Sequence, residues 1–147
     1  MSALLVKVRG LLSDSGIDFC PGVDACGEES IDLVWTTGNP DVAVQIRERF
    51  YDERLIVEAR IDCCLPEGQY RAACVLLNEF NYRSHAQVRM EESYYCYRRR
   101  CDVYPLVSSA DVFGDAVSKE VLQRYICLTC EGLREAHEVL LRLLNGS

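Results

Sequence analysis

The chain has 147 residues and a formal net charge of −7, and 49% of its residues are hydrophobic while 27% are charged. This length suits one ordinary domain with a sizeable core, and the composition is typical of a folded globular protein. The acidic balance opposes binding to nucleic acid, because phosphate groups reward clustered lysine and arginine. We therefore expect a single domain over residues 1–147 that has no nucleic-acid partner.

The hydrophobic segments are short. No stretch approaches the roughly 20 continuous apolar residues that a membrane-spanning helix needs. Lys7 and Arg9 interrupt the apolar N-terminal run, whereas the apolar part of a secretion signal is continuous. The nine cysteines are an odd number, and without a secretion signal they predict reduced thiols and no complete disulfide framework. We expect a cytoplasmic protein without a membrane partner.

The N-terminal segment predicts a short amphipathic helix over residues 3–15. Its leucines and valines recur at helical spacing, and Gly16 follows where a left-handed C-terminal cap is expected. The next stretch, residues 17–30, mixes proline, glycine and acidic residues with isolated apolar ones. It predicts a loop that holds a brief strand around Ile17 to Cys20.

Alternating apolar and polar residues then predict three consecutive strands. The alternation is clearest in the third, where apolar residues face one side and charged residues the other. Short turn segments connect the strands, so we expect an antiparallel meander with one buried and one solvent-exposed face. The predicted strands cover residues 31–37, 42–50 and 55–63, and the turns lie at Gly38-Asn39-Pro40 and Tyr51-Asp52-Glu53.

A second helix is predicted after Leu65, with Pro66 in its first turn and its end near residues 81–84. Alternation resumes at residues 86–90, which predict a short strand. After a turn, a long strand is expected from Tyr94 to Tyr104.

A long final helix is predicted near the C-terminus. Pro105 is expected to mark a strand end or an edge position, and residues 108–117 are expected to be irregular. Ser118 is a suitable N-cap for the helix, which ends before Asn145. Its expected apolar face comprises Val121, Leu122, Tyr125, Leu128, Thr129, Gly132, Leu133, Ala136, Val139, Leu140, Leu143 and Leu144.

The predicted fold class is α+β. The order is α-β-β-β-α-β-β-α, with an antiparallel sheet of about five strands and helices packed on one side. This order and the mid-chain sequence Leu77-Asn78-Glu79-Phe80-Asn81 resemble the YbjN-like family and the related type III secretion chaperone fold. The resemblance implies a domain without catalytic residues, often dimeric, that binds a partner protein.

The tyrosine- and arginine-rich segment is the predicted partner-binding surface. Tyrosine and arginine are enriched at the energetic centres of protein interfaces. On one continuous strand only one alternate set of side chains would be exposed, and we expect that set to be Tyr94, Arg98 and Arg100. The alternative is that these residues merely cover the solvent side of the sheet.

The final helix predicts a two-fold dimer interface. On a helical wheel Cys127 lies opposite the apolar face, Cys130 on its flank, and Leu141 also points outward. Small domains often form two-fold dimers, so these residues are candidates for a homodimer contact. The alternative is that they are scattered exposed apolar residues of no consequence.

Cys127-Leu128-Thr129-Cys130 favours an alternative function, because a CxxC pair can be redox-active or form half of a zinc site. No second ligand pair with suitable spacing accompanies it, and it lies inside a helix instead of at its start. The leading prediction therefore assigns these thiols to packing or an interface. A cysteine-dependent metal-binding or redox-responsive protein remains the alternative.

No catalytic pattern is present. Neither His85 nor His137 has a nucleophile and an acid nearby in a recognised arrangement, and no glycine-rich phosphate loop occurs. We predict no enzyme activity, no cofactor and no metal. The predicted function is a non-catalytic protein-binding module of chaperone or regulatory type, whose partner is a secreted effector or a signalling protein.

Overall fold

The computed structural model describes residues 2–49, 53–84 and 87–144. Its described residues form one antiparallel sheet of seven strands and three α-helices, with a short 3-10 turn at Gly114–Ala116. The helices are α1 (Ala3–Asp14), α2 (Tyr70–Ser84) and α3 (Lys119–Leu144). The strands are β1 (Cys20–Val23), β2 (Glu29–Trp35), β3 (Val42–Arg49), β4 (Arg54–Cys64), β5 (Val88–Met90), β6 (Tyr94–Cys96) and β7 (Cys101–Phe113).

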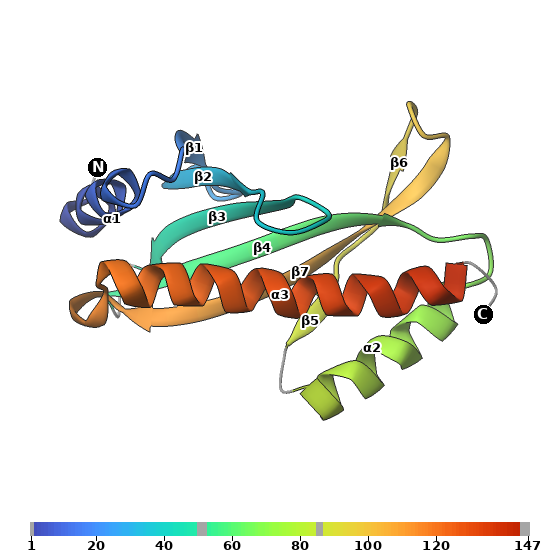
Figure 1. Ribbon diagram of the computed structural model, residues 1–147. Coiled ribbons are helices and arrows are strands. Elements are labelled where there is room, and N and C mark those ends of the chain that lie inside the picture. Colours follow the sequence, from blue (N-terminus) through green and yellow to red (C-terminus); the bar gives the residue numbers. More distant parts are fainter. Residues whose placement is uncertain (1, 50–52, 85–86, 145–147) are drawn as a thin grey trace.

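The sheet is built around two long neighbouring strands. Its order is β1-β2-β3-β4-β7-β5, and β6 also pairs with β7. Strand β4 pairs with β7 along its full length, from Arg54 opposite Phe113 to Cys64 opposite Val103. Figure 1 shows all three helices on the same side of the sheet, with α3 running across it. The predicted α+β class and element order are confirmed, and the sheet has seven strands where about five were expected.

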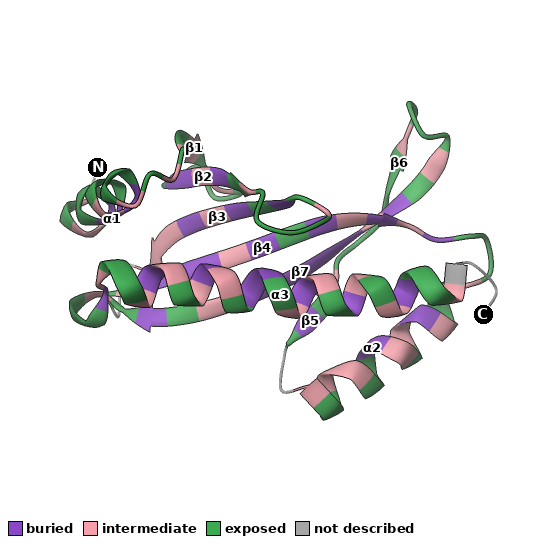
Figure 2. Ribbon diagram, in the orientation of Figure 1, coloured by how far each residue is buried: buried purple, intermediate pink, exposed green. Residues whose placement is uncertain are grey.

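The core lies between this helical layer and the inner face of the sheet. Alternate residues of β4, such as Leu55, Val57 and Ala59, are fully buried there, opposite Ile126 and Leu133 of α3. Figure 2 shows buried positions along the middle strands and at intervals along α3. Burying apolar surface contributes about 25 cal/mol per Å² to stability, so the contact between the helices and the sheet is the main source of stability.

Two of the expected helix-terminal residues, Ser118 and Gly16, take the predicted roles, and Pro66 does not. Ser118 Oγ accepts a hydrogen bond from the Val121 amide at 3.2 Å, which confirms the expected N-cap of α3. Gly16 takes a left-handed φ of 70° at the end of α1, as its expected capping role requires. Helix α2 begins at Tyr70, so Pro66 lies in the preceding turn, where its carbonyl accepts from Gln69, and is not in the first turn of the helix.

The mid-chain motif ties α2 to the sheet. The Asn81 side-chain amide donates to the Val88 carbonyl at 2.8 Å and accepts from the Val88 amide at 2.9 Å. This two-way contact satisfies the backbone at the start of β5. None of the described helices is long and apolar enough to span a membrane.

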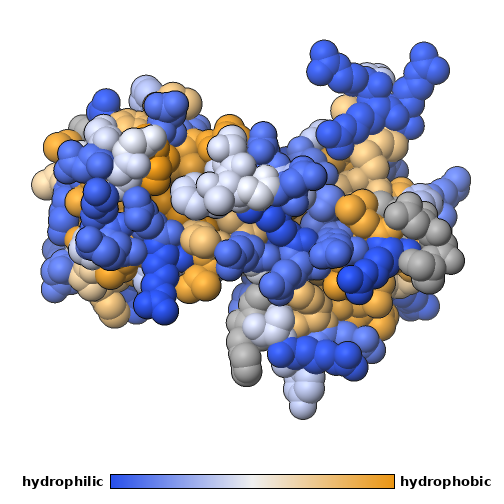
Figure 3. Space-filling view, in the orientation of Figure 1, coloured by the Kyte–Doolittle hydropathy of each residue, from blue (hydrophilic) through white to orange (hydrophobic). Residues whose placement is uncertain are grey.

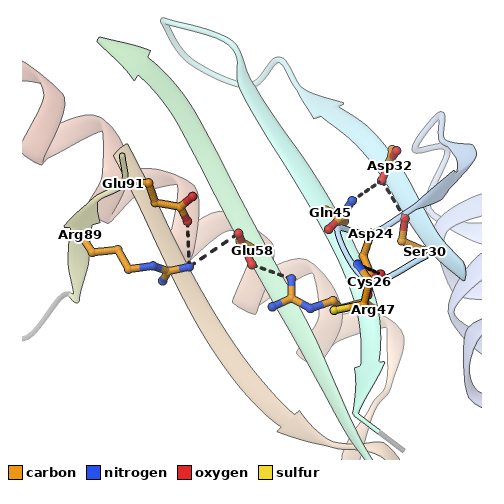
Figure 4. A network of polar contacts seen from close by, with 9 residues as sticks. All are labelled: Asp24, Cys26, Ser30, Asp32, Gln45, Arg47, Glu58, Arg89 and Glu91. Carbon is orange, nitrogen blue, oxygen red and sulfur yellow. Dashed lines mark hydrogen bonds and ion pairs between the residues drawn. The ribbon is translucent and has the colours of Figure 1, made fainter. Parts of the chain in front are cut away.

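The outer face of the sheet carries cross-strand charges. Glu58 on β4 lies between Arg47 on β3, at 2.5 Å, and Arg89 on β5, at 3.7 Å (Figure 4). Asp32 accepts from Ser30 and Gln45 in the same view. None of the described helices covers this face (Figure 1), so the expected division into one buried and one solvent-exposed face is confirmed.

The long strand predicted from Tyr94 to Tyr104 is wrong. Residues 97–100 form a turn, so that β6 and the start of β7 make a hairpin. Cys96 and Cys101 are the strand residues that face each other next to the turn, and both thiols are free. Arg100 supplies the left-handed backbone that such a turn needs, with φ of 54°, although arginine is not a usual residue there. The turn therefore carried no glycine or asparagine signal in the sequence.

The region predicted to be irregular, residues 108–117, continues as β7 to Phe113. Its apolar and polar residues do not follow the two faces, because Ser108 is buried on the inner face and Phe113 is 57% exposed on the outer face. The preceding residue, Val107, points to the outer face and is still buried. Val107 lies directly between Arg60 on β4 and Arg89 on β5, whose aliphatic stems can cover it.

Pro105 lies inside β7 and does not end it. Its carbonyl accepts from the Glu91 amide, so its ring nitrogen also faces the side of β7 where β5 has ended and β6 has not begun. A proline at this gap removes no ladder hydrogen bond with β4. The short strand predicted at residues 17–20 forms three residues later, at Cys20–Val23.

Arg134 of α3 holds the connection between β2 and β3. Its guanidinium donates to the carbonyls of Pro40 at 2.8 Å, Trp35 at 3.3 Å and Thr37. Gly38, with φ of 100°, lies against this guanidinium, and a side chain there would collide with it. The contact fixes the far end of β2 to the helical layer.

We expect Arg134→Met to lower the free energy of unfolding by about 2 kcal/mol, because three carbonyls lose a charged donor. Urea denaturation measures this change. Arg124→Met, at an exposed arginine of the same helix, is the matched control and should change stability by less than about 0.5 kcal/mol. Equal effects of the two substitutions would contradict the assigned role.

Candidate functional site

The hairpin of β6 and β7 projects beyond the helical layer. Figure 1 shows it rising from the sheet away from α3, and Figure 3 shows hydrophilic side chains extending from its tip. Tyr97 in the turn is 85% exposed and meets Tyr95 edge to face, with ring centroids 4.9 Å apart. The expectation that only one alternate set is exposed fails here, because both sides of a projecting hairpin reach solvent.

The three predicted partner-binding residues occupy different places in this hairpin. Tyr94 lies at its base, where its hydroxyl donates to Asp62 of β4 at 2.9 Å. That hydrogen bond raises the pKa of Tyr94, and Asp62 is also paired with Arg60 at 3.0 Å. Tyr94 therefore anchors the hairpin to the sheet.

Arg98 and Arg100 lie in the turn, and both are exposed. Arg100 occupies the left-handed position, whereas Arg98 lies two residues earlier at the tip. The structure thus brings the two arginines to the tip of the hairpin and leaves Tyr94 at its base. The three predicted residues therefore do not share one face of a strand.

A second candidate site, which the sequence did not indicate, is an open groove beside β2. It has a volume of about 1350 Å³. It lies between the segment that joins α1 to β1 and the end of β2, and it reaches the first turns of α3. Its lining residues are Ser15, Gly16, Ile17, Asp18, Phe19, Cys20, Asp32, Leu33, Val34, Trp35, Thr36, Thr37, Ala43, Val44, Gln45, Glu58, Arg60, Glu120, Gln123, Arg124 and Cys127.

The groove exists because the strand pairing stops early. Among the described residues, β1 pairs with β2 from Val23 to Cys20 only, which ends opposite Asp32. The last three residues of β2, numbers 33–35, pair with β3 on one side and have no strand on the other. The edge of the sheet is therefore open along the groove.

Apolar side chains and an excess of acids line this groove. Trp35 and Phe19 are partly buried against the core, and Val34 is 58% exposed. Hydrophobic surface is visible in Figure 3 left of centre, in the part of the molecule that contains α1 and the first strands. The charged lining residues are four acids and two arginines: Asp18, Asp32, Glu58, Glu120, Arg60 and Arg124.

The sole tryptophan was the one available signal for the groove. Trp35 lines the groove and packs, partly buried, against the core. Where the neighbouring strand would end could not be deduced from alternation, since that depends on the register of β1 with β2.

The predicted homodimer contact is not assembled as expected. Cys130 is fully buried among the core residues of α3, so it does not lie on the flank of the helix. Cys127 is half-buried and lines the groove, and its thiol donates to Glu131 at 3.2 Å. Leu141 is exposed as expected.

The wheel misplaced the buried side of α3 by part of a turn. Leu128, expected on the apolar face, is 57% exposed, whereas Ile126 and Cys130 take its place in the core. The exposed positions between Cys127 and Leu141 include Glu131, Glu135 and Glu138.

The CxxC pair has the wrong surroundings for redox chemistry. Burial raises the pKa of Cys130 to about 12, and the bond to Glu131 raises the pKa of Cys127. Reactive thiols need the opposite shift. The described residues contain no group of three or more metal-ligating side chains, and His85 lies outside them. Burial lowers the pKa of His137.

The raised pKa of Cys130 predicts a loss of stability at high pH. The thiol titrates at about 12 in the folded state and near 9 in the unfolded chain, so its contribution is complete below pH 9 and declines above it. Between pH 8 and pH 10.5 the free energy of unfolding should fall by about 1–2 kcal/mol less in Cys130→Ala than in the wild type, measured by urea denaturation. Cys26→Ala, at an exposed thiol, is the control. Parallel pH profiles for wild type and Cys130→Ala would contradict the assignment.

Comparison with known proteins gives a likeness in fold. No family model matches the chain, and no curated protein matches it significantly. YbjN from E. coli, described as a candidate transcription regulator, matches with a TM-score of 0.56 and 15% identity over 97% of this chain and 93% of that one. An uncharacterised protein from Methanothermobacter thermautotrophicus matches with a TM-score of 0.56 and 9% identity, over 97% of both chains.

The ExsC–ExsE complex is a looser match, with a TM-score of 0.48 and 18% identity over 98% of this chain and 97% of that one. The predicted likeness to YbjN is confirmed at the level of the fold. The chain therefore has a YbjN-like fold, and at 15% identity the likeness concerns the fold alone.

Proposed function

We propose that the protein is a non-catalytic module that binds an extended segment of a partner protein in the groove beside β2. The observation that carries this proposal is the open edge of β2 along an apolar-lined groove. An extended segment can pair with such an edge through main-chain hydrogen bonds, while its alternate side chains enter the groove.

The size of the groove favours a peptide over a small ligand. Pockets for small molecules have volumes of about 300–1,000 Å³ and enclose most of the ligand. This groove is larger, at about 1350 Å³, and open along its length. A polypeptide in extended form suits that shape.

The charges of the groove favour a partner segment with basic residues. Its lining has four acids against two arginines, and the whole chain carries a net charge of −7. Opposite charge on the partner would speed association and set the register. We propose a segment that alternates apolar and basic side chains, as in a disordered part of a secreted effector or a signalling protein.

The hairpin tip is the second proposed contact. Arg98 and Arg100 are exposed there together with Tyr97, and these residue types dominate binding energy at protein interfaces. Tyr94 belongs to the proposed surface as the residue that positions the hairpin through Asp62. We also propose that the protein acts in the cytoplasm, where proteins rarely hold permanent disulfides, since its nine cysteines are free in the structure.

Replacing Val34 by lysine tests the groove. Val34 is 58% exposed and lines the groove, so Val34→Lys should leave the fold intact and place a bulky cation where a basic segment docks. Wild-type protein should select a common motif from a phage-displayed library of random linear peptides. We expect Val34→Lys to weaken binding of a selected peptide about tenfold, a loss of roughly 1.4 kcal/mol, measured by isothermal calorimetry.

Val75→Lys is the matched control, because Val75 is 53% exposed and lies on α2, outside the groove. It should bind the selected peptide as wild type does. Equal weakening by both substitutions would contradict the proposal, and so would a library from which no peptide is enriched.

We also propose a homodimer, in which Cys127 and Leu141 of α3 lie at or near the contact. The exposed acids Glu131, Glu135 and Glu138 lie on the same side of α3, so that contact would be small in apolar area. Light scattering should give a dimer mass that Leu141→Glu reduces to that of the monomer. A monomer mass for wild type at all concentrations would contradict this prediction.

A thiol-dependent function is the second candidate. The observation that favours it is the contact between Cys64 and Cys101, whose sulfur atoms lie 2.7 Å apart.

A further inference from the structure

Two cysteines meet where β4 ends and the hairpin begins. Cys64 is the last residue of β4, and Cys101 is the first residue of β7. Since Cys64 lies opposite Val103 in the ladder, Cys101 is its diagonal neighbour two residues away. The sulfur atoms lie 2.7 Å apart, and those of a disulfide lie about 2.05 Å apart. Bond formation therefore requires an approach of roughly 0.7 Å.

The surroundings distinguish the two sulfurs. The guanidinium of Arg99, in the hairpin turn, donates to the Cys64 sulfur at 3.8 Å. The hydrogen bond between the two thiols raises the pKa of Cys101 to about 11, so Cys101 keeps its proton at neutral pH. The Cys64 sulfur therefore lies beside a cationic group, the kind of surroundings in which reactive cysteines are found.

We propose that Cys64 and Cys101 form a reversible disulfide by exchange with a low-molecular-weight disulfide such as oxidised glutathione. Cys64 loses its proton and its sulfur attacks one glutathione sulfur, and the S–S bond breaks to release one glutathione as thiolate. Cys101 then loses its proton and attacks the Cys64 sulfur of the mixed disulfide, which releases the second glutathione. Two protein thiols are oxidised to one disulfide, and one oxidised glutathione is reduced to two thiols that take up the two protons.

The other cysteines are placed less favourably. Cys63 and Cys130 are buried in the core, and burial raises their pKa values to about 11 and about 12. Cys96 faces Cys101 across the hairpin ladder, so it is the nearest competitor for the same bond.

The bond would fasten the hairpin to the sheet. It joins positions 37 residues apart in the chain and would close a loop that contains α2. Beside the hydrogen bond from Tyr94 to Asp62, it would give the hairpin base a second tie to β4. The thiol chemistry does not depend on the proposed binding function, whereas any effect on partner binding rests on it.

The test uses the full chain, fully reduced and then equilibrated in buffers of graded reduced-to-oxidised glutathione ratio. Free thiols are trapped with N-ethylmaleimide, and mass spectrometry of the intact and the digested protein locates the bond. We expect one disulfide, between Cys64 and Cys101, that disappears at reducing ratios. The oxidised protein should melt roughly 5–10 °C higher than the reduced one.

Variants separate this bond from its competitors. Cys101→Ser should accumulate the mixed disulfide of Cys64 with glutathione, and Cys64→Ser should form no disulfide. Cys96→Ser is the control and should form the Cys64–Cys101 bond as wild type does. Cys64→Ala replaces Cys64→Ser if the serine variant does not fold. A bond at Cys96–Cys101 or Cys127–Cys130, or no bond at any ratio, would overturn the proposal.

Discussion

The fold depends on one packing constraint. All three helices bury their apolar sides against the same inner face of a single sheet (Figure 1). The long helix α3 covers the inner face of β4 and β7, where Val57 and Leu133 belong to the same core. One helix cannot cover a twisted seven-stranded sheet completely. The two exposed features lie where this cover stops: the groove beside the end of β2 and the hairpin of β6 and β7 (Figure 1). The same packing that stabilises the fold thus determines which backbone remains open to a partner.

Local pattern predicted the elements that have one buried and one exposed face. Strand β4 was identified from its alternation, and α3 was located by Ser118 and its apolar stripe. Pattern failed in β7, since Ser108 is buried on the inner face and Val107 is buried on the outer face, in register with Arg60 and Arg89 of the neighbouring strands. It failed again at the hairpin turn, where Arg100 adopts a left-handed backbone without a glycine to indicate it. The first failure comes from contacts between strands that are distant in sequence, and the second from a local backbone conformation that the residue type does not indicate.

The candidate sites were harder to predict than the fold, because they depend on how strands pair and where the chain turns. Tyrosine and arginine composition identified the segment around Arg98, but the side chains expected to share one face are distributed along a hairpin. The CxxC pair attracted attention by its spacing, yet Cys130 is buried in the core. The pair of thiols that meets, Cys64 and Cys101, is separated by 37 positions and has no local signature. Only the register of β4 with β7 brings them together.

The central claim is that a partner segment binds along the open edge of β2. Hydrogen exchange of the backbone amides, followed by mass spectrometry with and without a selected peptide, tests it most directly. The account predicts that the peptide slows exchange in residues 33–35 and in the facing segment 15–20, because new main-chain hydrogen bonds form there. Slower exchange confined to the hairpin, or unchanged exchange along β2 at saturating peptide, would contradict it.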